Sequence, residues 1–263
     1  MKKTMKNTLI AFVLAVAAVA LIACGGNNEP TPPTIQTDEG TTSSANPTPA
    51  PPTQTTPEVF TEQNIDGTSV QTVEVGDLID FGGREWRVLD VQDGSALILS
   101  DRIVTRRGVH PQNVSITWES SEIRGWLNGS FYQNTFTSDE QARIAETRIT
   151  NNDHPWFGTP GGINTIDKIF LLSVEEVVNF FGDSGELAIP QPSSHGFISD
   201  TYNYARMAFD DGGEAFCWWL RTPGYRSSNV SKVGFDGHLD LHMGGTWLSF
   251  DGIGIRPALW LYL

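Results

Sequence analysis

Residues 216–224 are Phe-Cys-Trp-Trp-Leu-Arg-Thr-Pro-Gly, and residues 254–261 are Gly-Ile-Arg-Pro-Ala-Leu-Trp-Leu. Both stretches are dense in large apolar side chains, so we expect them to form strands in the core of a domain. Each stretch also contains one arginine. A buried guanidinium needs a carboxylate or several carbonyl oxygens nearby, so we interpret Arg221 and Arg256 as structural residues.

Apolar segments alternate with turn dipeptides in the rest of this region. The segments are 230–235, 238–243, 246–250 and 253–263, and the dipeptides are Pro223-Gly224, Asp236-Gly237, Gly244-Gly245 and Asp251-Gly252. Short runs separated by glycine-containing turns are typical of antiparallel β-structure. The C-terminal part of the domain is therefore predicted to be a set of short antiparallel strands.

The region before these strands predicts an N-terminal hairpin and two to three helices. Residues 83–91 alternate apolar and polar side chains, and Asp93-Gly94 supplies a tight turn before the apolar run 96–99. Helix start signals lie at Thr117 or Ser120, at Ser138 and at Ser173, each ahead of apolar residues at helical spacing. Residues 168–172 are apolar throughout most of their length and predict a buried strand. The fold class is therefore α+β.

The first 23 residues have the pattern of a signal peptide. Three lysines at positions 2, 3 and 6 precede an uncharged apolar run over residues 9–22. This run is shorter than the roughly 20 residues that a membrane-spanning helix needs. The segment Leu21-Ile22-Ala23-Cys24 resembles the bacterial lipobox, in which the cysteine is lipidated and the chain is cut just before it. The resemblance implies a lipoprotein whose partner is the membrane, held through Cys24 on the extracytoplasmic side.

Residues 24–74 are dominated by proline, threonine, serine, asparagine and glutamine. Such a segment has too few large apolar side chains to offset the entropy of ordering it. We therefore expect a disordered tether that its prolines keep extended. Residues 75–263 remain, and they are sufficient for one domain with its own core.

The chain is acidic, with a formal net charge of -14. Loss of the three lysines of the signal peptide makes the mature chain more acidic still. An acidic surface repels nucleic acid and anionic lipid headgroups, so we expect no nucleic-acid partner.

Several motifs together resemble the bacterial domain of unknown function family 6273. Besides residues 216–224 and 254–261, the motifs are Trp86-Arg87-Val88-Leu89, Thr117-Trp118-Glu119, residues 123–128 and residues 167–173. The resemblance covers residues 75–263 and implies a C-type lectin-like fold, in which the last strand pairs near the first. Proteins with this kind of fold have diverse functions, so the resemblance leaves the activity open.

His238, Asp240 and His242 alternate with apolar residues, so on a strand these three side chains would share one face. Two imidazoles and a carboxylate are suitable ligands for a divalent metal, which makes the three residues weak candidates for a metal site. We prefer the simpler interpretation of an exposed polar face. We expect no cofactor, and no local pattern singles out catalytic residues.

The segment between the two core stretches carries mixed polar and aromatic side chains of the kind that recognise proteins or sugars. The candidates for ligand contact are Tyr225, Arg226, His238, Asp240, His242 and Trp247. We therefore expect a binding module for an unidentified extracellular protein or glycan. Two alternatives stay open, namely an extracytoplasmic enzyme such as a metal-assisted hydrolase, and an envelope structural protein.

The lipobox generates the first prediction. Replacing Cys24 by serine removes the thiol that the lipid would modify, so Cys24→Ser should abolish labelling by a radioactive fatty acid and release the chain from membranes. The wild-type chain, expressed at the same level, is the control. Unchanged labelling of the variant would show that the segment is not a lipidation site.

Overall fold

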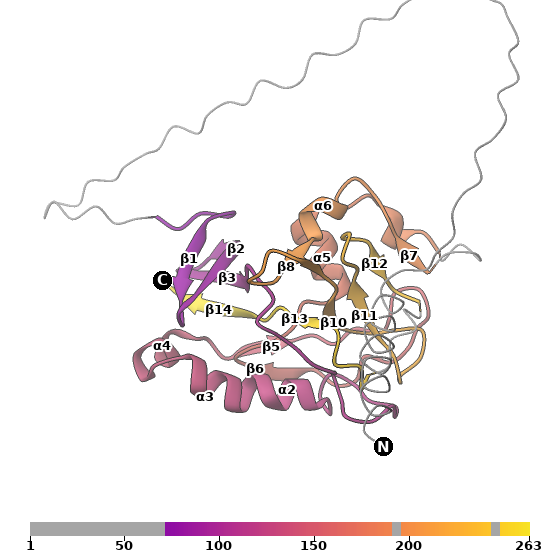
Figure 1. Ribbon diagram of the computed structural model, residues 1–263, viewed down its shortest axis with the longest axis horizontal. Helices are drawn as coiled ribbons and strands as arrows, with labels where there is room; N and C mark the ends of the chain where they lie inside the picture. The colour runs from indigo at the N-terminus through magenta and orange to yellow at the C-terminus, as the bar shows by residue number, and fades with distance from the viewer. Residues whose placement is uncertain (1–71, 191–195, 243–247) are drawn as a thin grey trace, which may run out of the picture. The chain divides into compact units, whose positions relative to one another are not determined.

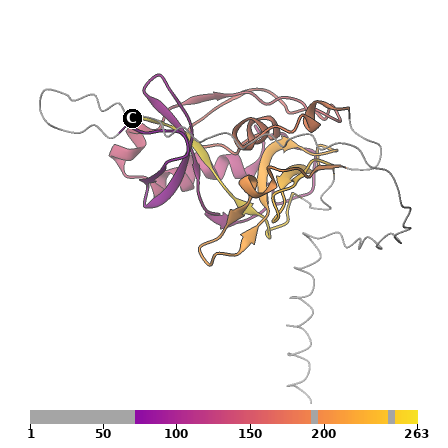
Figure 2. The same cartoon turned by 90° about the horizontal axis from the view of Figure 1, so that it is seen from above.

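Two β-sheets, one of four strands and one of six, organise the described part of the chain, which is residues 72–190, 196–242 and 248–263 of a computed structural model. The two sheets lie toward opposite ends of the domain in Figure 1 and in the perpendicular view of Figure 2. Two small pairs complete the β-structure: β5 (Thr147–Ile149) with β6 (Thr165–Asp167), and β8 (Ala208–Phe209) with β9 (Ala215–Phe216). The predicted α+β class is confirmed.

The four-stranded sheet contains the predicted hairpin. Its order is β1 (Leu78–Phe81), β2 (Arg84–Gln92), β3 (Ser95–Ser100) and β14 (Ala258–Tyr262). Asp93 and Gly94 make the turn with positive φ values of 49° and 72°, which aspartate tolerates and glycine adopts without strain. Strand β14 runs antiparallel to β3, so the C-terminal strand pairs with the N-terminal hairpin as expected.

The six-stranded sheet is built around strands β10 (Trp218–Pro223) and β11 (Val230–Val233), with shorter strands on both sides. Its order is β4 (Thr105–Arg106), β13 (Gly254–Ile255), β10, β11, β12 (Leu239–Asp240) and β7 (Phe197–Ile198). The prediction of antiparallel C-terminal strands is wrong for one pair, since β10 and β13 are parallel. Strand β11 already occupies one side of β10, and the long connection to β13 allows a parallel pairing on the other side.

One long helix lies in three parts, α2 (Glu122–Trp126), a π-helical turn η1 (Leu127–Phe131) and α3 (Tyr132–Thr135). Its N-cap is Ser121, whose side chain accepts a hydrogen bond from the backbone N–H of Arg124, so the predicted caps at Thr117 or Ser120 are wrong. Helix α4 (Ser138–Arg143) begins after a Thr137 cap. In Figure 1, α2, α3 and α4 run along one side of the sheets.

The remaining helices lie on the other side of the sheets in Figure 1. They are α5 (Val174–Phe181), the short 3-10 turn η2 (Glu186–Ala188) and α6 (Asn203–Arg206). Helix α5 begins at the predicted Ser173, which forms a capping box with Glu176. Among the described residues, no helix has the length and apolar character needed to cross a membrane.

The predicted strand at residues 168–172 is wrong. Ladder pairing stops at Asp167 in β6, and beyond it only Phe170 forms an isolated bridge, with Ala258. The segment is nevertheless buried from Ile169 to Leu172. The apolar run therefore indicates that the segment is buried in the core, not that it belongs to a sheet. Hydrophobic periodicity alone does not distinguish these two cases.

Asp167 joins three of the motifs that are separated in the sequence. Its side chain is fully buried and accepts hydrogen bonds from Trp118 Nε1 at 2.8 Å, Thr165 Oγ1 at 2.7 Å and Arg124 Nε at 2.7 Å. Nearby, Asn128 Nδ2 donates to Ile169 O, and Asn128 Oδ1 accepts from the backbone N–H groups of Lys168 and Ile169. The long helix is therefore fixed to β6 by buried polar contacts that are mutually satisfied.

Arg256 departs from the expectation for a buried arginine. Its Nε donates to Ser100 O at 2.7 Å, and its guanidinium lies over the rings of Trp218 and Phe181, at 5.2 and 5.7 Å. Burial lowers the pKa of Arg256 to about 10. Two aromatic faces, rather than a set of carbonyls, therefore accommodate this cation.

Removal of the Asp167 carboxylate should destabilise the domain. Asp167→Ala leaves a buried indole N–H, a hydroxyl and a guanidinium without their shared acceptor, so we expect a loss of about 3 kcal/mol in the free energy of unfolding. The measurement is urea denaturation, with the exposed Asp211→Ala as a control that should change stability by less than about 0.5 kcal/mol. Equal stability of the two variants would contradict the role given to Asp167.

Candidate functional site

Three aromatic rings from separate segments meet at the surface. The Tyr225 ring stacks on the His242 imidazole with centroids 5.1 Å apart, and Phe157 packs edge-on against both, at 5.0 Å from Tyr225 and 5.6 Å from His242. Tyr225 is 41% exposed, and Phe157 and His242 are half-buried. Aromatic pairs in these geometries stabilise one another, so the rings form a defined platform rather than independent side chains.

Backbone contacts hold the platform in place. Tyr225 follows β10 directly after Pro223-Gly224, and its N–H donates to His242 O at 3.0 Å. Thr159 Oγ1 donates to Tyr225 O, also at 3.0 Å. These bonds tie the loop after β10 to the chain after β12 and to the loop that carries Phe157. The three rings therefore keep one relative arrangement.

Arg226 adds a positive charge to the platform. Its guanidinium carbon lies 5.5 Å from the centre of the Tyr225 ring, and the residue is exposed. An exposed guanidinium beside aromatic faces provides forked donors next to an apolar surface. We call Phe157, Tyr225, Arg226 and His242 the recognition cluster.

His154 supports the recognition cluster from beneath. Its ring is buried, lies 4.7 Å from the Phe157 ring and places Nε2 3.0 Å from Leu241 O. Nδ1 accepts from the backbone N–H groups of Trp156 at 3.0 Å and Phe157 at 3.3 Å. Because Nδ1 is an acceptor, the neutral ring carries its proton on Nε2. Burial lowers the pKa of His154 to about 4, which favours this neutral form.

The other predicted contact residues are engaged elsewhere. His238 Nδ1 bonds Asp236, and its ring lies 5.9 Å from that of Phe197. Asp240 pairs with Lys232, whose Nζ lies 3.4 Å from Asp240 Oδ2. Cys24 and Trp247 lie outside the described residues.

The structure therefore does not bring His238, Asp240 and His242 together around one point. Within the described ranges, no three histidine, cysteine, aspartate or glutamate side chains form a group that could hold a metal ion. Only Asp240 of the three belongs to β12, so the expected common strand face does not form, and each side chain contacts a different neighbour.

Sequence reasoning missed Phe157 and His154. Both lie in the loop between β5 and β6, far along the chain from Tyr225. The only local signal is the sequence His154-Pro155-Trp156-Phe157, in which three aromatic side chains lie close together within a polar loop. Large aromatic residues in a loop without an apolar period are candidates for contacts that the local pattern cannot identify.

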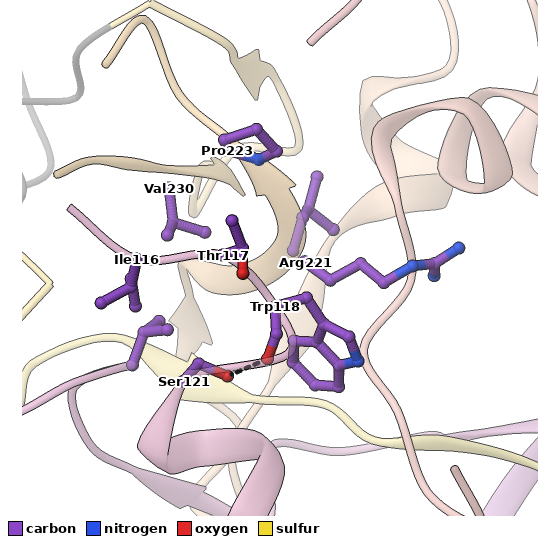
Figure 3. A pocket seen from close by; sticks show the side chains of 9 residues that line it. Ile116, Thr117, Trp118, Ser121, Arg221, Pro223 and Val230 are labelled. Carbon is purple, nitrogen blue, oxygen red and sulfur yellow. Dashed lines mark hydrogen bonds between the residues drawn. The ribbon is translucent and has the colours of Figure 1, made fainter. Parts of the chain in front are cut away.

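A small pocket lies between residues 116–118 and the end of β10 (Figure 3). Its volume of about 10 Å³ is enough for roughly one water molecule. Ile116, Pro223 and Val230 line it, while Arg221 directs its guanidinium away from it. The pocket is therefore a packing gap between two motifs and is too small for a ligand.

The chain matches a known protein family. A family model described as a domain of unknown function, DUF6273, matches residues 93–263. The matched range begins in the turn between β2 and β3, so the Trp86 motif lies outside it. No curated protein and no solved structure matches the chain significantly.

The buried neutral His154 predicts acid sensitivity. An unfolded histidine takes up a proton near pH 6.5, whereas folded His154 resists protonation until about pH 4. Stability from neutral His154 is therefore fully present above pH 6.5 and is lost as the pH falls through this window, by roughly 3 kcal/mol at about 1.4 kcal/mol per pH unit. Urea denaturation at pH 7 and pH 4 measures this loss. His154→Gln should be less stable at pH 7 and should show a correspondingly flatter pH dependence, and parallel curves would refute the assignment.

Proposed function

We propose a ligand-recognition function for this chain, which belongs to the DUF6273 family. In this proposal the protein is a lipoprotein, anchored through Cys24 and displayed outside the membrane. Its domain binds an extracellular protein or glycan through the recognition cluster. The observation that carries the proposal is the stacked and partly exposed platform of Tyr225, His242 and Phe157 beside the Arg226 guanidinium.

The composition of the cluster supports binding rather than packing. Aromatic and arginine side chains dominate the energetics of many interfaces, because they present large contact areas together with polar groups. Tyr225 and Arg226 keep exposed surface available for a partner, while the rings behind them are already ordered. A pre-ordered platform loses little conformational entropy when a ligand binds.

The arrangement of strands supports a C-type lectin-like fold as part of the proposal. The order of elements is an N-terminal hairpin, a long helix with further helices, and then short strands. The last strand, β14, returns to the hairpin. In such folds, loops at one end of the scaffold vary while the core is kept, which agrees with a recognition cluster built on loops after β10 and β12.

A glycan array and a screen of extracellular proteins, both probed with the full chain purified in detergent, test the proposed function. A ligand whose binding depends on the recognition cluster is the expected result. An enzyme would instead be revealed by turnover of a screened compound. The alternative of a metal-assisted hydrolase would need other metal ligands than His238, Asp240 and His242, since these three residues contact different neighbours.

Alanine variants of the cluster should separate binding from folding. Tyr225→Ala and Arg226→Ala should each weaken binding of the screened ligand by at least about tenfold, which is the scale of a hot-spot residue. The melting temperature should change by only a few degrees, because both side chains are exposed.

Matched controls come from outside the cluster. Tyr204→Ala removes a tyrosine that is 82% exposed on α6, and Arg148→Ala removes an exposed arginine of β5. Both should leave binding unchanged. If the controls weaken binding as much as the cluster variants do, the recognition surface lies elsewhere.

A further inference from the structure

A larger hollow lies between the β4 region and helix α2. It is a cleft of about 470 Å³, within the range of about 300–1,000 Å³ that small-molecule sites occupy. Its lining residues are Thr105, Arg106, Arg107, Gly108, His110, Pro111, Glu122, Trp126 and Asp251. The cleft shares no residue with the recognition cluster, so it is a separate candidate site.

Hydrogen bonds between backbone groups and side chains hold the walls of the cleft. Arg107 O accepts from Trp219 Nε1 at 3.0 Å, and Gly108 N–H donates to Asp251 Oδ1 at 2.9 Å. A Cβ atom on Gly108 would lie 2.6 Å from Leu248 O, so this close approach requires glycine. The cleft is therefore formed before any ligand arrives.

The two arginines of the cleft differ in their charge environment. Arg107 Nη2 lies 2.8 Å from Glu122 Oε1, and its guanidinium stands over the Trp126 ring at 4.8 Å. Arg106 is exposed, and in the described part of the chain no carboxylate pairs with it. Its guanidinium lies 4.7 Å from the centre of the Phe216 ring, which orients it without neutralising it. Arg106 is thus the uncompensated cation of the cleft.

The remaining lining groups favour a hydroxylated ligand. The carboxylates of Glu122 and Asp251 are acceptors for hydroxyl groups, and Trp126 and Pro111 offer apolar surface. His110 adds a polar ring, whose Nδ1 is buried without a hydrogen-bond partner among the described residues. The same two carboxylates repel a polyanion, so the cleft suits a ligand with a single negative group.

We propose that this cleft binds a saccharide that carries one carboxylate. Arg106 pairs with the carboxylate through its forked donors, a geometry in which arginine and carboxylate match. The two acidic residues accept hydrogen bonds from ring hydroxyls, and Pro111 offers apolar surface to the sugar ring. This site is separate from the recognition cluster, and the proposal for the cleft does not depend on ligand binding by that cluster.

A ligand-observed NMR titration of the full chain in detergent tests the ligand class. The probes are D-glucuronate, the uncharged D-glucose and D-glucose 6-phosphate. Glucuronate should bind at least about tenfold more tightly than either of the others. Equal affinity for glucose would show that the ligand's carboxylate does not contribute to binding. Tighter binding of glucose 6-phosphate would show that the preferred anionic group is a phosphate rather than a carboxylate.

Variants then locate the site. Arg106→Gln should weaken glucuronate binding by at least about tenfold at an unchanged melting temperature, Arg106→Lys should retain part of the affinity, and the exposed Arg148→Gln should have no effect. Tyr225→Ala should also leave glucuronate binding intact. Loss of binding in Tyr225→Ala but not in Arg106→Gln would place the sugar on the recognition cluster and refute the cleft.

Discussion

The ion pair between Arg221 and Glu176 holds together the segments from which the rest of the domain is arranged. The guanidinium Nη1 and Nη2 lie 2.5 and 2.6 Å from the two carboxylate oxygens, and the arginine side chain is almost fully buried. The same guanidinium donates to Leu171 O at 2.7 Å and to Thr150 O at 3.3 Å. A buried cation with this many acceptors is tolerated, and loss of its carboxylate would cost more than the pair itself contributes.

This contact also sets the position of the recognition cluster. Glu176 caps helix α5 through Ser173, and Thr222, next to Arg221, accepts from the N–H of Val174. Strand β10 is therefore fixed against the start of α5, and Tyr225 leaves the strand directly after that junction. On the other side, Thr150 begins the loop that carries Phe157. The segments that carry Tyr225 and Phe157 thus begin at neighbouring points of one buried junction.

The sequence predicts the elements whose signals are local. The Asp93-Gly94 turn and the Ser173 capping box each lie within a few residues, and the structure contains both. The prediction of a strand at residues 168–172 is wrong, because an apolar run indicates burial in the same way for a strand and for an irregular core segment. The parallel pairing of β10 with β13 depends on which side of β10 is free, which is a property of the whole sheet.

The candidate site also depends on contacts between residues far apart in the sequence, which local patterns do not predict. Tyr225 and His242 both belong to the polar and aromatic stretch between the two core motifs, so composition identifies them as candidates, but their partner Phe157 comes from a loop that no local pattern connects to them. His238, Asp240 and His242 alternate with apolar residues in the sequence, yet only Asp240 belongs to β12, and each of the three contacts a different partner. Spacing along a strand gives the face on which a side chain lies, whereas the partner of that side chain depends on the tertiary fold.

The point at which the chain enters the domain decides which sheet a membrane tether would join. The described chain enters the domain just before β1, in the four-stranded sheet, and its C-terminal strand lies in the same sheet. Three residues of the recognition cluster lie on segments that follow β10 and β12, strands of the six-stranded sheet toward the other end of the domain (Figures 1 and 2), and Phe157 lies in the loop between β5 and β6. In the proposed lipoprotein, a tether therefore joins the sheet that does not carry the cluster. Attachment in that proposal uses the entry to β1, whereas recognition uses loops that join other strands, so one domain keeps the two functions on separate elements of the fold.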